Sequence, residues 1–275
     1  MIGVSIQCRL GNQLFQYAFA KASAEKLNTS FFLIEGEEQF VLPKYFELEG
    51  YSKPLNIFRK IIYKIKNKSF FKSLQATEIQ LSTTPVSDNN VYSGYFQSGL
   101  FFENIATKLA TYIKVKPQYL SIFNKLYGEL FDKDKVIAIH IRRGDYLNLD
   151  YWWLENLGSD NLSLPITYFE KCLAQIENVD SYKIIFTSDD IGYVKNVFGN
   201  FKNAIFAEHD MITDFQILMN ANICILSNSS FSWWAAYLNR NQDKKVFCPK
   251  HWLGFKIQKE YPNDIIPKEW LQTKV

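Results

Sequence analysis

The sequence predicts an α/β protein built on mainly parallel β-sheets. Short apolar runs that suit buried strands alternate with segments of helical composition, and small polar residues directly follow several of the runs. Such an alternation makes each helix the crossover between parallel strands, so that helices cover both faces of a sheet. The 275 residues are enough for two domains. We place the boundary near residue 130, at the polar stretch from Asp132 to Lys135.

The first predicted domain, residues 1–130, opens with a strand, a glycine-containing turn and a helix. Residues 2–7 alternate apolar with small polar side chains, which is typical of a strand. The turn from Cys8 to Asn12 follows, and residues 13–27 are rich in Ala, Leu, Phe and Lys, a composition typical of helices. With a further strand expected at residues 31–34, this is the beginning of a βαβ unit.

The second predicted domain, residues 131–275, shows the alternation more clearly. Thr167 and Glu170 form a capping-box pattern, which predicts the start of a helix. Pro249 ends the run that we expect to be the last strand. The expected strands are residues 136–141, 183–187, 204–207, 223–226 and 245–248, and the expected helices are residues 168–176, 214–220 and 231–238.

Composition argues against several kinds of protein and site. Basic residues outnumber acidic ones by only 31 − 28 = 3, so we expect no nucleic-acid partner. No uninterrupted run of about 18 apolar residues and no secretory signal pattern occurs, so we expect no membrane span. The three histidines form no zinc motif. The cysteines lack C-x-x-C spacing, which indicates reduced thiols and a cytoplasmic location; they are Cys8, Cys172, Cys224 and Cys248.

Residues 51–77 differ from the rest of the chain because they are strongly basic and contain no Asp or Glu. Apolar residues alternate with the basic ones at helical spacing, which predicts an amphipathic helix. Such a helix is either a solvated element with one face in the core or a surface helix that makes peripheral contact with anionic membrane lipid. The basic residues are Lys53, Arg59, Lys60, Lys64, Lys66, Lys68 and Lys72, and the apolar ones are Ile57, Phe58, Ile61, Ile62 and Ile65.

Ligands of parallel α/β sheets bind outside the carboxyl ends of the strands, so the residues after each predicted strand matter most. Small polar or charged residues stand there in four places: residues 9–12, 140–145, 188–190 and 228–230. We expect these segments to converge on a ligand site. Polar loops at strand ends are, however, also the ordinary case.

The segment His140-Ile141-Arg142-Arg143-Gly144-Asp145 is the most informative of the four. Paired arginines after a buried strand are costly unless an anion meets them, and guanidinium groups bind phosphate in a bidentate way. A diphosphate leaving group needs such donors, because its negative charge grows as the bond to the sugar breaks. Asp145 can hold an arginine in place or contact a sugar hydroxyl. The alternative is a structural ion pair among Arg142, Arg143 and Asp145.

Asn228, Ser229 and Ser230 stand between a predicted strand and a predicted helix. Hydroxyls and free N–H groups at a helix start favour phosphate binding, and ordinary N-capping by serine is the alternative. Asp189 and Asp190 suit recognition of a base or a ribose, and they equally suit a helix cap.

The chain has one Asp-x-Asp pattern of the kind that holds a divalent ion, Asp132-Lys133-Asp134. It precedes the expected strand at residues 136–141, so we place it at the opposite end of the sheet from the ligand site. We therefore expect no metal and no other cofactor, and neutralisation of the diphosphate by arginine instead.

Four segments are spread over nearly the whole chain. They are Leu10-Gly11-Asn12-Gln13-Leu14-Phe15-Gln16-Tyr17-Ala18, Gly94-Tyr95-Phe96-Gln97-Ser98, His140-Ile141-Arg142-Arg143-Gly144-Asp145-Tyr146 and Asn228-Ser229-Ser230-Phe231-Ser232-Trp233-Trp234. In this order they resemble the bacterial α-1,2-fucosyltransferases of glycosyltransferase family 11.

The resemblance implies a GT-B fold, in which two Rossmann-like domains face a cleft: an acceptor-side domain at residues 1–130 and a GDP-sugar domain at residues 131–275. It also implies inverting transfer of L-fucose from GDP-β-L-fucose to the 2-hydroxyl of a β-galactoside-type glycan, without a metal ion. The implied roles are Arg142 at the donor pyrophosphate, His140 and Asp214 at guanine, Ser229 and Ser230 at phosphate, and Asn12, next to Gly11, near the fucose and the acceptor.

The expected acceptor is an oligosaccharide or lipid-linked glycan of polysaccharide biosynthesis. Two departures from the family pattern affect it: Cys8 and Arg9 stand where the family usually has glycines, and residues 147–161 lack the usual pattern. Our candidate for the general base is Asp145, the carboxylate nearest the expected phosphate site. The alternatives are a mechanism without a carboxylate base, a different GDP-hexose donor, or a non-catalytic protein that binds a nucleotide sugar.

Overall fold

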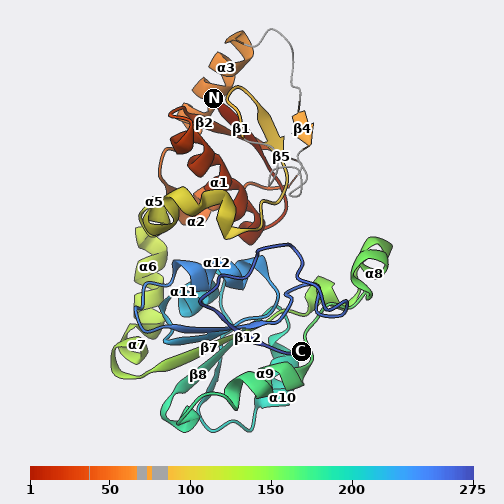
Figure 1. Cartoon of the computed structure of the whole chain (residues 1–275). Coiled ribbons are helices and arrows are strands. Elements are labelled where there is room, and N and C mark those ends of the chain that lie inside the picture. The colour runs from red at the N-terminus through yellow and green to blue at the C-terminus, as the bar shows by residue number, and fades with distance from the viewer. Residues whose placement is uncertain (37, 67–72, 76–85) are drawn as a thin grey trace. The chain divides into compact units, whose positions relative to one another are not determined.

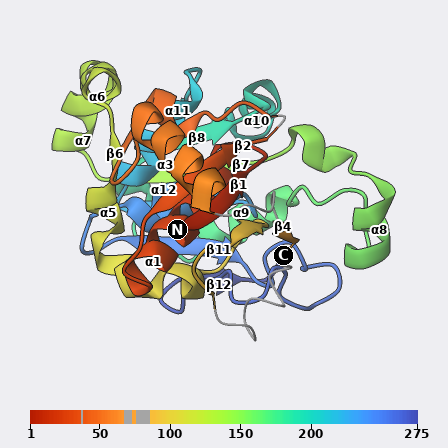
Figure 2. The ribbon, with the colours of Figure 1, turned by 90° about the horizontal axis from the view of Figure 1, so that it is seen from above.

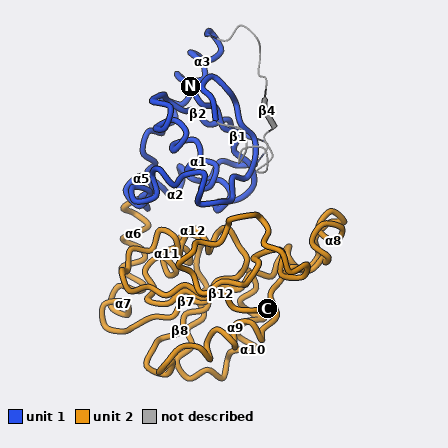
Figure 3. The backbone as a smooth tube through the Cα atoms, viewed as in Figure 1, with its two compact units in different colours: residues 1–116 blue, residues 117–275 orange. Residues whose placement is uncertain are grey.

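The computed structural model describes residues 1–36, 38–66 and 86–275, together with the backbone of residues 73–75. The chain divides into two compact units, Met1–Lys116 and Pro117–Val275 (Figure 3). The division lies earlier than the boundary that we placed near residue 130. The helix α6 (Pro117–Phe123) belongs to the second unit, where Gln216 Nε2 donates a hydrogen bond of 3.2 Å to the carbonyl of Tyr119.

The first unit contains a parallel sheet with the strand order β2-β1-β5-β4 among its described strands. β1 (Ile2–Ile6) and β2 (Phe31–Glu35) confirm the two strands predicted near the N-terminus. The other elements of this unit are α1 (Leu10–Lys26), α2 (Leu42–Tyr45), β3 (Phe46–Leu48), α3 (Lys53–Lys66), β4 (Ser73–Gln75), β5 (Val91–Ser93), the 3₁₀ segment η1 (Gly99–Lys108), α5 (Leu109–Tyr112) and β6 (Ile113–Val115), which pairs antiparallel with β3.

The second unit contains a six-stranded parallel sheet with the order β12-β11-β10-β7-β8-β9. Its central strand β7 (Val136–Ile141) is buried at all of its residues, as expected for a strand covered on both faces. The other strands are β8 (Lys183–Ser188), β9 (Ala204–Phe206), β10 (Ile223–Ile225), β11 (Lys245–Pro249) and β12 (Leu271–Thr273). The parallel pairing in both units confirms the predicted α/β class.

Helices cover the two faces of this sheet (Figure 1). α11 (Met211–Asn220) and α12 (Ser230–Leu238) lie on one face, and α9 (Ile166–Leu173) and α10 (Ile191–Phe198) lie on the other. α8 (Tyr151–Leu157) projects from the body of this unit in two perpendicular views (Figure 2). The remaining segments are η2 (Asn124–Gly128), α7 (Glu129–Lys133), η3 (Gly144–Leu147) and η4 (Val179–Ser181).

Three sequence-based expectations about these elements were wrong. The capping box at Thr167 is not used, because α9 begins at Ile166 with Pro165 at its N-cap. β11 is not the last strand, since β12 pairs with it near the C-terminus. α1 begins at Leu10 rather than after Asn12, so Gly11 and Asn12 lie in its first turn.

None of the described helices has the length and apolar composition needed to cross a bilayer. Part of the basic segment at residues 51–77 forms α3, and its residues 67–72, 76 and 77 lie outside the described residues.

Candidate functional site

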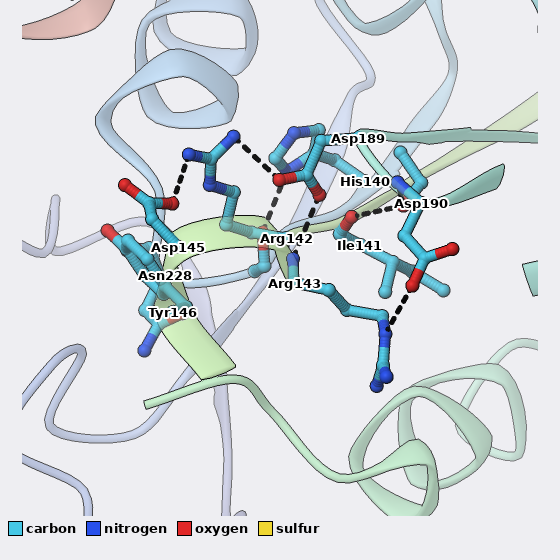
Figure 4. Close-up of polar contacts among 11 residues, drawn as sticks. His140, Ile141, Arg142, Arg143, Asp145, Tyr146, Asp189, Asp190 and Asn228 are labelled. Carbon is cyan, nitrogen blue, oxygen red and sulfur yellow. Dashed lines mark hydrogen bonds and ion pairs between the residues drawn. The ribbon is translucent and has the colours of Figure 1, made fainter. Parts of the chain in front are cut away.

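Polar residues follow three adjacent strands of the second unit (Figure 4). β10, β7 and β8 are parallel neighbours, so their carboxyl ends meet at one edge of the sheet. Arg142 follows β7, Asp189 follows β8 and Asn228 follows β10. This arrangement confirms the predicted convergence of these three segments.

Arg142 is held between two carboxylates at this edge. Its Nη1 lies 2.9 Å from Oδ2 of Asp189, and its Nη2 donates to Oδ1 of Asp145. Its guanidinium also lies over the ring of Tyr146, 5.5 Å from the ring centroid. A guanidinium has five N–H donors, so these contacts fix its plane and leave donors over for a ligand.

Arg143 points in the opposite direction (Figure 4). Its Nε donates to Oδ2 of Asp190 over 3.1 Å, and its guanidinium lies 3.4 Å from the ring centroid of Tyr193 in α10. The alternative ion pair is therefore present for Arg142 and Asp145, whereas Arg143 pairs with a different carboxylate. The two arginines do not form one shared donor cluster.

Gly144 allows this segment to turn. Its φ is +21°, and a Cβ atom there would lie 2.2 Å from Oδ2 of Asp189. The other oxygen of Asp189, Oδ1, accepts the backbone N–H of Arg143 over 2.9 Å. Asp189 thus fixes both the backbone of this segment and the side chain of Arg142, and any side chain at position 144 would displace its carboxylate.

His140 is buried beneath the same edge. Its Nδ1 lies 2.7 Å from the hydroxyl of Ser227, and its ring centroid lies 5.4 Å from that of Phe231. Burial, reinforced by the charge of Arg142, lowers the pKa of His140 to about 3. The imidazole is therefore neutral at physiological pH and acts through hydrogen bonds rather than charge.

The N-terminus of α12 lies at the same edge and has no side-chain cap. Ser229 occupies the N-cap position, but its side chain does not accept a capping hydrogen bond, contrary to the N-capping alternative. Asn228 is fully buried; its Nδ2 donates to the carbonyl of Leu162 over 2.9 Å, and its Oδ1 has no hydrogen-bond partner among the described residues. The carbonyl of Asn228 accepts the hydroxyl of Tyr146 over 3.2 Å, which connects this turn to the segment of Arg142.

Asp214 lies in the first turn of α11. Burial, followed by the charge of Asp210, raises the pKa of Asp214 to about 8. Its Oδ1 is buried and has no hydrogen-bond partner among the described residues. The ring centroid of the next residue, Phe215, lies 5.5 Å from that of Phe231, whose ring also contacts His140. A buried acid with an unused oxygen indicates that a ligand or a proton completes it.

In the first unit, the predicted residues Gly11 and Asn12 lie at the carboxyl end of β1. The Oδ1 of Asn12 accepts a hydrogen bond of 2.7 Å from Nε2 of Gln97, so two of the four motif segments meet here. Cys8, which stands where a glycine was expected, has a φ of +61°. This is the left-handed region that favours glycine, so the turn tolerates Cys8 at some cost in strain.

Asp132 and Asp134 lie before β7, at the end of the sheet away from Arg142, as predicted. Within the described residues, no group of three or more His, Cys, Asp or Glu side chains is placed to hold a metal ion.

The protein-family model described as glycosyl transferase family 11 matches residues 1–274 of the chain. The chain belongs to this family. Two similar proteins come from Escherichia coli. The O-antigen biosynthesis glycosyltransferase WbnK is 24% identical, in an alignment that covers 89% of this chain and 92% of WbnK. An α-1,2-colitosyltransferase is 25% identical, in an alignment that covers 96% of each chain.

Solved structures with a similar fold include two fucosyltransferases. NodZ, an α-1,6-fucosyltransferase from Bradyrhizobium soaked with GDP-fucose, has a TM-score of 0.54 at 15% identity, covering 86% of this chain and 92% of NodZ. FUT1 of Arabidopsis thaliana in complex with GDP has a TM-score of 0.52 at 12% identity, covering 90% of this chain and 69% of the FUT1 chain. These similarities confirm the GT-B fold of this family 11 glycosyltransferase.

Three neighbours of the site in this family 11 chain were not among the predicted site residues. The guanidinium of Arg142 lies over the ring of Tyr146, and that of Arg143 lies over the ring of Tyr193. The hydroxyl of Ser227 is hydrogen-bonded to the ring of His140. Tyr146 is the last residue of one motif segment and Ser227 directly precedes another, so their positions were a usable signal. Tyr193 lies in a separate helix, and nothing in the local sequence connects it to Arg143.

Proposed function

We propose that this family 11 glycosyltransferase transfers L-fucose from GDP-β-L-fucose, with inversion, to the 2-hydroxyl of a β-galactoside-type glycan. The observation that carries the proposal is the placement of Arg142. Its guanidinium is fixed by Asp145 and Asp189 at the carboxyl ends of β7 and β8, which is where parallel sheets bind ligands. An oriented guanidinium there suits a diphosphate that gains negative charge as the sugar leaves.

The N-terminus of α12, which has no side-chain cap, suits the same diphosphate. The backbone N–H groups of a first helical turn attract anions when no side chain caps them, and the Ser229 side chain does not cap this helix. The Tyr146–Asn228 hydrogen bond connects the Arg142 segment to this turn. We infer that Arg142 and the hydroxyls of Ser229 and Ser230 contact the phosphates together.

Asp214 and His140 suit the guanine base. Guanine presents N–H donors on its Watson–Crick edge, and Oδ1 of Asp214 is a buried acceptor with no partner among the described residues. Neutral His140 offers a hydrogen bond without charge repulsion against Arg142. Binding of guanine to the ionised form of Asp214 would release a proton near neutral pH.

Asp145 is our candidate for the general base that activates the acceptor hydroxyl. Its carboxylate is exposed enough to meet an acceptor, but it also pairs with Arg142. The alternative is that Asp145 only positions Arg142 while departure of the diphosphate drives the reaction. Asp145→Asn distinguishes these roles: a base predicts loss of the acidic limb of the kcat–pH profile, whereas a positioning role predicts a uniform decrease at all pH values.

The acceptor is the less constrained part of the proposal. A relative from Escherichia coli acts in O-antigen biosynthesis, which supports an oligosaccharide or lipid-linked glycan acceptor for this chain. We propose that Asn12, held by Gln97, lies near the fucose and acceptor. We also propose that transfer needs no metal ion, because Arg142 and a helix N-terminus supply the positive charge at the diphosphate.

A second candidate donor is a GDP-activated colitose. The observation that favours it is the 25% identity, over 96% of each chain, to an α-1,2-colitosyltransferase. The same guanine and diphosphate contacts serve both donors, so only the sugar pocket distinguishes them.

The test is a mass-spectrometric assay of the purified protein with GDP-fucose, GDP-colitose and other GDP-hexoses, on lactose and N-acetyllactosamine, with and without EDTA. We expect a fucosylated product whose linkage analysis gives the 2-position and whose yield EDTA leaves unchanged. Turnover with another GDP-sugar alone would replace the donor. GDP binding without turnover on any acceptor would instead identify a non-catalytic nucleotide-sugar binding protein.

A further inference from the structure

The helix α3 attaches to the first unit through its polar side. Asn56 is buried, and its side-chain amide pairs with the backbone of Leu33 in both directions: Nδ2 donates to the carbonyl over 2.9 Å, and Oδ1 accepts the N–H over 2.7 Å. Leu33 lies in β2, the terminal strand of the sheet. The amide therefore satisfies backbone groups that a free sheet edge would leave unpaired.

Two more polar side chains of α3 make contacts of the same kind. Nη1 of Arg59 donates to the carbonyls of Phe31 and Gly50, over 3.0 and 2.7 Å. The hydroxyl of Tyr63 donates to the carbonyl of Asn89 over 3.0 Å. Positions 56, 59 and 63 lie on one side of a helix, so this side is fixed to the unit by polar groups.

The apolar side of α3 points away from the unit. Residues of an α-helix are about 100° apart around its axis, which places positions 58, 61 and 65 opposite Asn56. In the part of the chain that the structure describes, Phe58, Ile61 and Ile65 are 59%, 51% and 71% exposed. This is the reverse of the usual surface helix, which buries its apolar side, and such a contiguous apolar patch marks an interaction surface.

Positive charge borders this apolar side. Lys53 lies along one margin of it and Lys66 along the other, and the helix contains no acidic residue. A second copy of the chain docked by the same patch would bring these lysines together, because a two-fold interface places a surface against itself. An anionic surface instead complements them.

We propose that α3 binds the surface of a membrane that contains anionic phospholipid. Phe58, Ile61 and Ile65 enter the boundary between headgroups and acyl chains, and the lysines contact the lipid phosphates. The polar side stays on the sheet edge, so binding requires no rearrangement of the first unit. This inference concerns where the protein is held and does not depend on the choice of donor or acceptor.

The experiment is co-sedimentation of the full chain with phosphatidylcholine vesicles, with and without phosphatidylglycerol, at low and high salt. We expect binding to the anionic vesicles that high salt weakens. Phe58→Ser/Ile61→Ser should lower the partition coefficient at least about ten-fold, and Lys53→Gln/Lys66→Gln about five-fold per lysine on anionic vesicles only. The matched controls, Phe201→Ser/Leu271→Ser and Lys245→Gln/Lys268→Gln, change exposed residues of the second unit and should bind like the unaltered protein.

Circular dichroism and transfer to a soluble acceptor establish that each variant is folded. Equal binding of the α3 variants and their controls would overturn the proposal, as would no binding to anionic vesicles. Analytical ultracentrifugation tests whether a second copy of the chain covers the apolar side instead. A dimer that dissociates in the variant Phe58→Ser/Ile61→Ser would assign this side to a second copy and likewise overturn the proposal. Membrane binding in a protein that fails to transfer fucose would leave this inference intact and reject only the proposed donor.

Discussion

The two units place different chemistry at the carboxyl ends of their first strands. In the first unit, neutral amides fill this position: fully buried Gln13 donates through Nε2 to the carbonyls of Cys8 and Gln39, both over 2.8 Å, and accepts the N–H of Val41 over 2.9 Å. In the second unit, charged groups fill it, with Arg142 between Asp145 and Asp189. The amide of Gln13 fixes the backbone of two loops, whereas Asp145 and Asp189 fix the guanidinium of Arg142.

The difference is also one of completeness. The amide of Gln13 uses both its nitrogen and its oxygen within the protein. In the second unit, by contrast, Oδ1 of Asp214 and Oδ1 of Asn228 are buried without a partner among the described residues. Unused buried acceptors and charges are costly in the free protein. We infer that a ligand completes the buried acceptors of the second unit, whereas the amide of Gln13 is completed within the protein.

The largest expected effect separates the two arginines of the second unit. Arg142→Ala should lower kcat/KM about a thousand-fold, on the order of 4 kcal/mol, because it removes the oriented donor at the leaving group. Arg142→Lys should recover little, since an ammonium keeps the charge but loses the planar fork. Arg143→Ala should cost less than about ten-fold, because that guanidinium is occupied by Asp190 and Tyr193.

Steady-state kinetics with the donor of highest turnover measure this difference, and thermal unfolding verifies that all three variants are folded. If Arg143→Ala cost as much as Arg142→Ala, both arginines would bind the diphosphate, and the contrast drawn from their orientations would be wrong.

The next effect concerns Asp214, the buried acid of the second unit whose Oδ1 has no partner among the described residues. The folded-state pKa of Asp214 is raised to about 8 from its ordinary value of 3.8, so the folded protein holds a proton that the unfolded chain releases. The associated stability is fully present below pH 3.8 and is lost as the pH rises through 8. Between pH 5 and pH 9 we expect the free energy of unfolding to fall by about 4 kcal/mol for this reason.

Urea denaturation across this range tests the assignment, with Asp214→Asn as the variant. The amide does not ionise, so Asp214→Asn should lack this decrease and should be more stable than the unaltered protein at pH 9. Asp210→Asn is the comparison: it removes one neighbouring charge, keeps a side-chain oxygen that can cap α11, and leaves the acid. A decrease of the same size in Asp214→Asn would assign the pH dependence to another group.

A smaller effect is expected for the buried amide of Gln13 in the first unit. Gln13→Leu keeps the approximate size of the side chain but removes three hydrogen bonds in a buried position, so we expect a loss of about 2 kcal/mol in unfolding free energy. Gln175→Leu is the matched control: this glutamine also donates to two acceptors, but it lies at the surface, and its loss should cost under about 0.5 kcal/mol. Equal losses would mean that burial does not strengthen the amide contacts.

Much of the site followed from the sequence because a parallel sheet restricts where it can lie. Once residues 136–141, 183–187 and 223–226 were taken as strands, their carboxyl ends had to meet if the strands were neighbours, and β10, β7 and β8 are. The positions of Arg142, Asp189 and Asn228 followed from that geometry.

The direction of individual side chains did not follow. Adjacent arginines in an irregular turn have no fixed periodicity, and Tyr193, which holds Arg143, lies in a helix nearly fifty residues later. Periodicity likewise identified α3 as amphipathic but not which side faces the protein, because the deciding contact is between Asn56 and the edge of β2. β12 escaped notice because two of its three residues are exposed and show no apolar pattern.

The smallest effect tests how tightly the charged segment is held. Gly144→Ala would place a Cβ atom 2.2 Å from Oδ2 of Asp189, the oxygen that also contacts Arg142. The atom it meets is the end of a side chain rather than backbone, so the carboxylate can turn away and the protein should fold with a loss of about 1–2 kcal/mol. The displaced carboxylate no longer aligns Arg142, so we expect kcat/KM to fall about ten-fold. Ser188→Ala is the control for general loosening, because it removes two hydrogen bonds of the same turn: 2.7 Å to the Ile141 carbonyl and 2.9 Å from the N–H of Asp190. If Ser188→Ala lowered kcat/KM as much, the position of the Asp189 carboxylate would not be what orients Arg142.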